Sequence, residues 1–101
     1  MSYVVMWEFH VRPGAEVEFE RVYGPEGDWV RLFRQGAGYV RSDLLRDREE
    51  KDRYVVLDHW VSRDQYDAFR AAHATAYGNL DRRCESLTSR ETHIGSFTVV
   101  E

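Results

Sequence analysis

The side chains best suited to chemistry on an organic ligand gather where a predicted strand, residues 54–61, meets the helix that follows it. Trp60 ends the strand, Tyr66 lies in the first turn of the helix, and His73 follows two turns further along the same helix face. An indole N–H and a phenol O–H are neutral donors on apolar rings, which suits them to orient a polycyclic phenol or quinone. A histidine that titrates near neutral pH can take a proton from such a ligand. These residues indicate a planar-ligand pocket with His73 as its base; the alternative is that all three pack in the core.

Two arginines further along the same helix could complete this site. Arg82 and Arg83 either belong to a solvated helix face or reach over the pocket, where one of them would hold a substrate oxyanion. We therefore expect Trp60, Tyr66, Arg82 and Arg83 to bind the substrate. Cys84, in contrast, lies on the apolar stripe of the helix, so a buried, unreactive thiol is a simpler interpretation than a nucleophile.

The sequence contains no motif for a metal ion or a nucleotide cofactor. The segment Gly36-Ala37-Gly38 precedes a predicted strand, whereas a dinucleotide loop must follow a strand and open a helix. The histidines have no spacing that is typical of a metal site; they are His10, His59, His73 and His93. We therefore expect the protein to work without a cofactor and without a metal.

Hydrophobic periodicity divides the chain into alternating strands and helices. The predicted strands are residues 3–11, 39–46, 54–61 and 92–100, and the predicted helices are residues 15–33, broken at Gly24-Pro25, and 62–87. Asp28 is expected to cap the second piece of the first helix, and Ser62 the start of the second helix. Gly78 lies inside the second helix and marks a place for a kink.

The element order β-α-β-β-α-β predicts an α+β, ferredoxin-like fold. Two right-handed crossovers place both helices on one face of a four-stranded antiparallel sheet and leave its other face uncovered. Because monomers rarely expose a large apolar patch, we expect a second copy of the chain to cover this face and form a homodimer.

Length and composition restrict the function further. The 101 residues, 43% of them hydrophobic, are enough for a single domain over residues 1–101. Eighteen acidic and fourteen basic side chains give a net charge of −4, without a basic stripe, so neither nucleic acid nor an anionic membrane is an expected partner. The N-terminal residues do not resemble a secretory signal, and a cytoplasmic location is the expectation.

Two segments of the chain resemble the antibiotic biosynthesis monooxygenase superfamily. These are Val11-Arg12-Pro13-Gly14, which ends the first strand, and residues 56–66, which are similar to the Trp-x-Ser signature of that superfamily. The resemblance implies a dimeric α+β barrel with a pocket between sheet and helices in each protomer. It also implies oxygenation of phenolic or quinol substrates without a bound cofactor. Anthrone monooxygenases of this superfamily have a Trp and, six residues later, a Tyr in the pocket, which Trp60 and Tyr66 match in spacing.

The chain also departs from the patterns of the superfamily. The polyketide branch has an Asn four residues before the Trp, where this chain has Val56, so one polar contact to substrate or peroxide is missing. The haem-degrading branch has an Asn in the first strand and a Trp in a helix, where this chain has Trp7 or Glu8 and Phe69, respectively. Haem degradation is therefore not expected.

The leading hypothesis is a cofactor-independent monooxygenase that deprotonates a phenolic, anthrone-like or quinol aromatic substrate and lets the anion react with O₂ directly. A small-molecule-binding or stress-response barrel without catalysis is the alternative, and a haem-binding module is a third hypothesis. All three require a pocket for a small molecule, and the first adds consumption of O₂.

Overall fold

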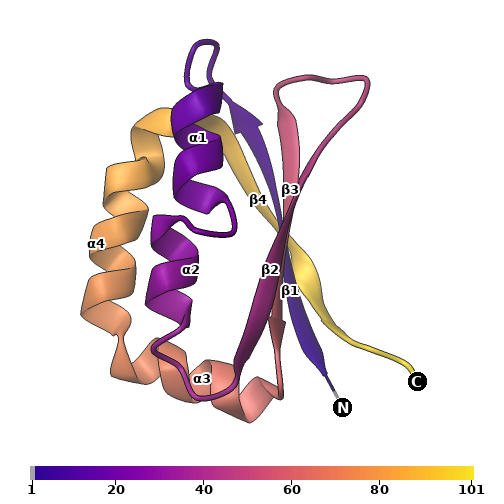
Figure 1. Cartoon of the computed structure of the whole chain (residues 1–101), viewed down its shortest axis with the longest axis vertical. Coiled ribbons are helices and arrows are strands. Elements are labelled where there is room, and N and C mark those ends of the chain that lie inside the picture. Colours follow the sequence, from indigo (N-terminus) through magenta and orange to yellow (C-terminus); the bar gives the residue numbers. More distant parts are fainter. Residues whose placement is uncertain (1) are drawn as a thin grey trace.

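The structure, a computed structural model, describes residues 2–101 as one antiparallel sheet with its helices on a single face (Figure 1). The sheet has four strands in the order β2-β3-β1-β4. The elements are β1 (Tyr3–Val11), α1 (Glu16–Tyr23), α2 (Asp28–Phe33), β2 (Tyr39–Arg46), β3 (Arg53–Trp60), α3 (Arg63–Ala72), α4 (Ala74–Cys84), a 3₁₀ turn (Glu85–Leu87) and β4 (Thr88–Thr98). The predicted ferredoxin-like α+β fold is confirmed.

The central strand β3 alternates strictly between buried and half-buried residues. Its buried residues point toward the helices and are Tyr54, Val56, Asp58 and Trp60. The strand pairs antiparallel with both β1 and β2, so Asp58 lies opposite Val5 on one side and opposite Ser42 on the other. This register places the Asp58 carboxyl group among apolar and aromatic side chains that face the helices.

The first helical region is broken, as predicted, into α1 and α2. Asp28 was expected to cap α2, but the structure corrects this: Gly27 is the N-cap residue, in an extended conformation, and Asp28 is the first helical residue. The Asp28 carboxylate accepts a hydrogen bond from Arg31 at 2.9 Å and lies 3.5 Å from Arg21. The ion pairs with these arginines therefore replace the capping interaction.

The second helical region is also in two pieces, and the break lies at His73 instead of near Gly78. Ser62 caps α3 as predicted, since its Oγ accepts a hydrogen bond from the Gln65 amide at 3.2 Å. His73 has φ −117° and ψ 28°, which ends α3 and allows α4 to start in a new direction. As a result α3 crosses the end of the sheet near the N-terminus, while α4 runs along the sheet (Figure 1). Gly78 lies within the uninterrupted helix α4.

The core fills the space between the sheet and the helices and is rich in aromatic rings. The rings form a chain of contacts with centroid separations of 4.3 to 6.4 Å. The helices in the described part of the chain are all too short and too polar to cross a lipid bilayer.

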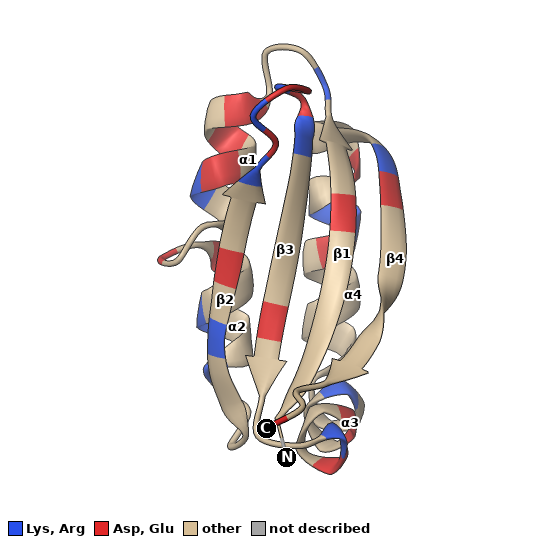
Figure 2. Ribbon diagram, turned by 90° about the vertical axis from the view of Figure 1, so that its right-hand side faces the viewer, with Lys and Arg blue, Asp and Glu red and all other residues tan. Residues whose placement is uncertain are grey.

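The other face of the sheet is free of helices (Figure 2). Leu45 on β2 and Ile94 and Phe97 on β4 are exposed, at 52%, 46% and 46% respectively. Ion pairs also lie across the strands, with Arg53 Nε at 2.6 Å from Glu8 and His59 Nε2 at 2.9 Å from Asp43.

Two glycine substitutions test this description of the helical layer. A Cβ at Gly78 would have only Arg82 Nη1 within 4 Å, at 3.6 Å, so Gly78→Ala should raise the free energy of unfolding by about 1 kcal/mol. A Cβ at Gly38 would overlap the Gln65 side chain of α3, so Gly38→Ala should destabilise the protein. Urea unfolding measures both changes. A destabilised Gly78→Ala variant would show that α4 is bent at this position.

Candidate functional site

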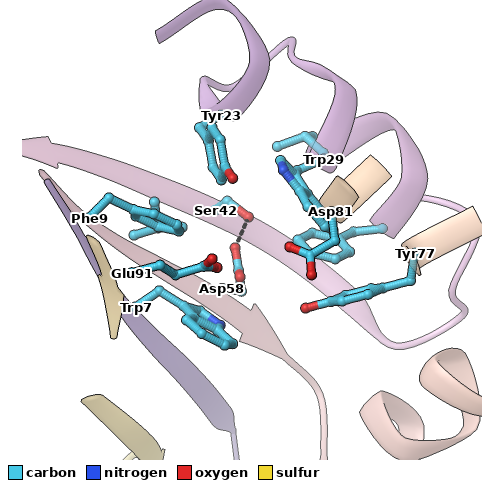
Figure 3. Close-up of a pocket in the computed structure, with 12 residues that line it drawn as sticks. Trp7, Phe9, Tyr23, Trp29, Ser42, Asp58, Tyr77, Asp81 and Glu91 are labelled. Atoms are coloured by element: carbon cyan, nitrogen blue, oxygen red, sulfur yellow. Dashed lines mark hydrogen bonds between the residues drawn. The ribbon is translucent and has the colours of Figure 1, made fainter. Parts of the chain in front are cut away.

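The candidate site is a cavity between the helix-facing side of the sheet and the helices α1, α2 and α4 (Figure 3). Its wall is mostly aromatic and apolar, with a few polar groups. The lining residues are Trp7, Phe9, Tyr23, Trp29, Val30, Phe33, Ser42, Val56, Asp58, Tyr77, Asp81 and Glu91. The cavity has a volume of only about 30 Å³, so a ligand with several rings requires the lining side chains to move apart.

Asp58 is the buried carboxyl group of this cavity. It is 6% exposed, and the hydrogen bond that it accepts comes from Ser42 Oγ at 2.5 Å. Burial raises the pKa of the Asp58 carboxyl to about 7, and the Ser42 hydrogen bond opposes this effect. Since a general base works best when its pKa is close to the working pH, Asp58 has the property that proton abstraction requires.

Ser42 connects Asp58 to a second hydroxyl group. The Ser42 hydroxyl donates to Asp58, so it accepts from the Tyr39 hydroxyl, which lies 2.8 Å away. Tyr39 and Ser42 also line a groove on the outer side of the molecule, together with Val40 and Arg34. The hydroxyl groups therefore form a chain from the cavity to the surface.

Three neutral donors also belong to the polar part of the wall. Burial raises the pKa of the Tyr23 and Tyr77 hydroxyls far above neutrality, so both keep their protons. Trp29 is 7% exposed, and its indole N–H has no hydrogen-bond partner among the described residues. Its ring contacts that of Tyr77 edge to face at 4.9 Å. A ligand oxygen could satisfy such a donor.

Two more carboxyl groups belong to the lining, and they come from different elements. Asp81 lies on α4 and Glu91 on β4. Loss of hydration raises the pKa of Glu91, and the negative charges of Asp81 and Glu85 raise it further. Figure 3 shows the Asp58, Asp81 and Glu91 carboxyl groups directed into the same space.

Trp60 and Tyr66 lie side by side, as their sequence positions suggested, but neither lines the cavity. Their ring centres are 5.4 Å apart. Trp60 is fully buried beneath α3, where its ring contacts Phe33 at 5.7 Å and Phe69 at 5.1 Å, and its indole N–H has no partner in the described part of the chain. Tyr66 accepts a hydrogen bond from Arg70 at 2.8 Å. The substrate-binding roles of Trp60 and Tyr66 stay predictions.

His73, Arg82 and Arg83 also lie outside the lining. The His73 ring stacks on Phe69 with 5.0 Å between centres, at the junction of α3 and α4. Arg82 is exposed and donates to the Asn79 side chain, and Arg83 is exposed beside an outer groove between α2 and α4. The roles predicted for these three residues, His73 as the base and the two arginines as substrate ligands, stay predictions.

Asp58 was not among the residues selected from the sequence, although a signal for it was present. In the segment 54–61 it shares its strand face with Tyr54, Val56 and Trp60, and a carboxylate among such residues indicates a buried acid. Asp81 and Glu91 had no such signal, because only the tertiary structure brings α4 and β4 to the same cavity.

One group of side chains in residues 2–101 has the spacing of a metal site, and it lies outside the cavity. Ligand atoms of His10, Glu50 and Asp52 lie within 4.8 Å of one another. The guanidinium of Arg90 lies 3.4 Å from His10 Nε2, where its positive charge would oppose a cation. We therefore assign no metal to this group.

Comparison with known proteins gives a consistent result. The family model described as antibiotic biosynthesis monooxygenase matches residues 2–77. The deoxynogalonate monooxygenase of Streptomyces nogalater is 34% identical over 88 residues, which cover 78% of this chain and 70% of that protein.

Solved structures share the fold over nearly the whole chain. SnoaB, a cofactor-independent oxygenase from Streptomyces nogalater, has a TM-score of 0.79 and 27% identity, with 99% of this chain and 94% of that chain covered. Rv0793 from Mycobacterium tuberculosis has a TM-score of 0.72 and 18% identity, with 100% and 97% covered. At this lower identity, the second likeness concerns the fold alone.

Asp58 should give the protein a characteristic dependence of stability on pH. Its pKa is raised from 3.8 to about 7 by folding, so the folded state holds its proton more tightly than the unfolded state. The contribution of this group to stability is therefore greatest below about pH 4 and is lost as pH rises to about 7. Asp58→Asn removes the charge that must be buried, and at about pH 8 it should be more stable than the wild type by at most about 4 kcal/mol.

Urea unfolding at about pH 5 and about pH 8 measures this difference, which should be larger at the higher pH. Asp43→Asn is the matched control, because Asp43 is half-buried on the opposite face of the sheet and pairs with His59. Equal effects of Asp58→Asn at both pH values would contradict a raised pKa for Asp58.

Proposed function

The chain belongs to the antibiotic biosynthesis monooxygenase family, and on this premise we propose that it is a cofactor-independent monooxygenase of a phenolic, anthrone-like or quinol substrate. The observation that carries the proposal is a buried carboxyl group, Asp58, with a pKa of about 7 in an aromatic-lined cavity. The 27% identical relative SnoaB is a cofactor-independent oxygenase, and the 34% identical relative is a deoxynogalonate monooxygenase. These two matches, both to an oxygenase of Streptomyces nogalater, support this class of reaction for the chain.

In the proposed reaction, written for an anthrone-like substrate, Asp58 first accepts a proton from the methylene carbon. The carbanion transfers its electrons to O₂, and a carbon–oxygen bond forms that gives a peroxide anion. Asp58 then returns the proton to the peroxide, and loss of water leaves a carbonyl group. In sum, a CH₂ group and O₂ become a C=O group and H₂O, so no outside reductant is needed. The protein contributes the proton transfers, positioning and electrostatic stabilisation.

The other polar groups of the cavity have separate roles in this proposal. Negative charge develops on the substrate oxygen when the carbon loses its proton, and the Tyr77 hydroxyl and Trp29 N–H are donors that can stabilise it. Trp7 stacks against the aromatic plane of the substrate. Val56 lines the cavity at the position where polyketide relatives have an Asn, so this chain lacks an amide there and has Asp58 two residues later.

In this proposal Trp60 and Tyr66 support the wall of the cavity from outside it. Trp60 contacts Phe33, which does line the cavity, so Trp60 and its neighbour Tyr66 support one wall. His73 as the base is the competing hypothesis, because the ligand must widen the cavity when it enters. Arg82 and Arg83 belong to the same competing hypothesis, in which the widened cavity lets one of them contact the substrate anion.

A homodimer joined through the helix-free face of the sheet is part of the proposal. The exposed Leu45, Ile94 and Phe97 give this face apolar side chains that a second copy would cover. Its ion pairs lie between neighbouring strands of the same chain, so they can stay formed when two such faces meet.

Oxygen uptake with a panel of anthrones and hydroquinones tests the catalytic proposal. Asp58→Asn keeps the shape of the side chain and removes its basicity, so turnover should fall by about 10²–10⁴-fold. His73→Ala and the Arg82→Ala, Arg83→Ala double variant should stay close to the wild-type rate, and Trp60→Phe should mainly weaken substrate binding.

Two results would overturn this assignment. A full rate in Asp58→Asn together with a large loss in His73→Ala would identify His73 as the base. Tight binding of aromatic ligands by the wild type without any O₂ consumption would favour a binding protein without catalysis.

Sedimentation equilibrium tests the homodimer. The wild type should sediment at twice the chain mass of 11.9 kDa at micromolar concentration. Phe97→Asp places a charge on the helix-free face and should give the monomer mass, whereas Val17→Asp, on the 84% exposed Val17 of α1, should leave the dimer intact. A monomeric wild type would rule out this interface.

A further inference from the structure

We infer that Ser42, oriented by Tyr39, is the positioning residue of Asp58: its hydroxyl binds one carboxyl oxygen in both protonation states and leaves the other oxygen free to take a proton from the ligand. The inference rests on the proposed function for the reaction in which Asp58 takes part, and it adds two residues to that reaction. It depends on the register of β2 and β3, on the hydrogen bonds of Ser42, and on the groups that surround Asp58.

Ser42 lies beside Asp58 because the antiparallel pairing of β2 and β3 makes these two residues direct partners. The hydrogen bond from Ser42 Oγ goes to Asp58 Oδ1 at 2.5 Å, and Oδ2 has no hydrogen bond to any residue that the structure describes. Figure 3 shows the carboxyl group directed into the cavity with Ser42 on one side of it. One oxygen is therefore bound by the protein, and the other is available to a ligand.

A serine hydroxyl can serve both forms of this carboxyl group, because it has one proton to donate and also accepts hydrogen bonds. When Asp58 is ionised, Ser42 donates its proton to Oδ1. When Asp58 carries a proton on Oδ2, Oδ1 is a carbonyl oxygen that still accepts from Ser42. The carboxyl group therefore keeps one orientation when it takes a proton from the substrate and when it returns that proton.

Tyr39 gives the Ser42 hydroxyl its direction. The Tyr39 ring is packed between Phe33 and Trp60, with 5.6 Å and 5.3 Å between ring centres. Burial raises the pKa of the Tyr39 hydroxyl, so this group keeps its proton at neutral pH and donates it to Ser42 Oγ at 2.8 Å. Ser42 accepts from Tyr39 and has its own proton left for Asp58.

Titratable and charged groups approach Asp58 from several elements. They are Tyr39 on β2, Tyr23 on α1, Tyr66 on α3, Tyr77 and Asp81 on α4, and Glu91 on β4. The strand β1 and the helix α2 present aromatic and apolar side chains to the cavity. The strand neighbours His59 and Asp43 pair with each other on the opposite face of the sheet. The Arg70 guanidinium is bound to the Tyr66 hydroxyl.

Among these groups Ser42 is the one that favours the ionised form of Asp58. Burial raises the pKa of the carboxyl group, and the hydrogen bond from Ser42 lowers it. Without this hydrogen bond the carboxyl group would keep its proton at neutral pH and could not accept another from a substrate. Ser42 therefore keeps the base usable near neutral pH as well as fixing its orientation.

Carbon-13 NMR of the Asp58 carboxyl carbon tests this role without turnover. In protein labelled at the aspartate carboxyl carbons, the Asp58 resonance is the one that Asp58→Asn lacks. In the wild type it should titrate with a pKa of about 7. In Ser42→Ala this pKa should rise by about 1 to 2, which is the usual effect of losing a hydrogen bond to a charged group.

Three further variants separate the hydroxyl group from packing. Ser42→Thr keeps a hydroxyl and should hold the pKa of Asp58 within about 0.5 of the wild-type value. Tyr39→Phe leaves Ser42 in place without its donor, so the pKa should rise by less than in Ser42→Ala. Ser89→Ala is the matched control, because it removes a serine hydroxyl on β4 that is bonded to the His10 carbonyl, and it should change nothing.

The same shift should appear in the pH dependence of O₂ uptake with an anthrone. After subtraction of the uncatalysed rate, kcat/KM of the wild type should rise with pH and level off above the pKa of Asp58, since the base acts in its ionised form. In Ser42→Ala the whole profile should move to higher pH, so the rate falls by about five- to fiftyfold at pH 7 and recovers in more alkaline solution. A variant with a distorted site would lose the same fraction of its rate at every pH.

The outcomes separate this inference from the proposed function. An unchanged pKa of Asp58 in Ser42→Ala, or a loss of rate that is equal at every pH, would overturn the inference while O₂ uptake by the wild type upheld the monooxygenase. A raised pKa in Ser42→Ala that Ser42→Thr restores, in a protein that consumes no O₂ with any anthrone, would support the role of Ser42 and overturn the monooxygenase function. If Ser42→Ala does not fold, Tyr39→Phe decides: a raised pKa supports the inference and an unchanged one overturns it.

Discussion

The register of β3 between its two neighbours is the constraint on which the rest of the structure depends. Because side chains alternate across a sheet, this register turns Asp58 and Trp60 toward the helices and His59 toward the opposite face. A slip of one residue would exchange these faces, placing an imidazole in the aromatic layer and the carboxyl on the helix-free side. The aromatic core, the cavity and the proposed chemistry all require the observed pairing.

The burial of Asp58 that this register imposes also lowers the stability of the folded protein. A carboxyl group that is buried with one hydroxyl partner and without a cation must either keep its proton or lose hydration without compensation. The unpartnered N–H groups of Trp29 and Trp60 have a similar cost. Such groups weaken the folded state when the site is empty, and a bound ligand that supplies the missing interactions would recover part of that stability.

Much of the fold could be predicted from the sequence, because periodicity and capping are local properties. The apolar alternation of residues 3–11 and the Ser62 cap indicated their elements correctly. The break at His73 could not be found in this way, since the three- and four-residue spacing continues through it. Trp60 and Tyr66 were correctly expected to be neighbours, but the turn of α3 across the sheet end, which separates them from the cavity, is a tertiary feature.

The hydroxyl groups of Ser42 and Tyr39 have a consequence for proton transfer in the proposed reaction. They join Asp58 to a groove on the outer side of the molecule. If each hydroxyl passes one proton and receives another, the Asp58 proton can exchange with bulk water by a path that does not cross the cavity. In the proposed reaction this hydroxyl chain gives Asp58 a second route for proton exchange, so that the base can be reset from the solution between turnovers without the cavity having to open.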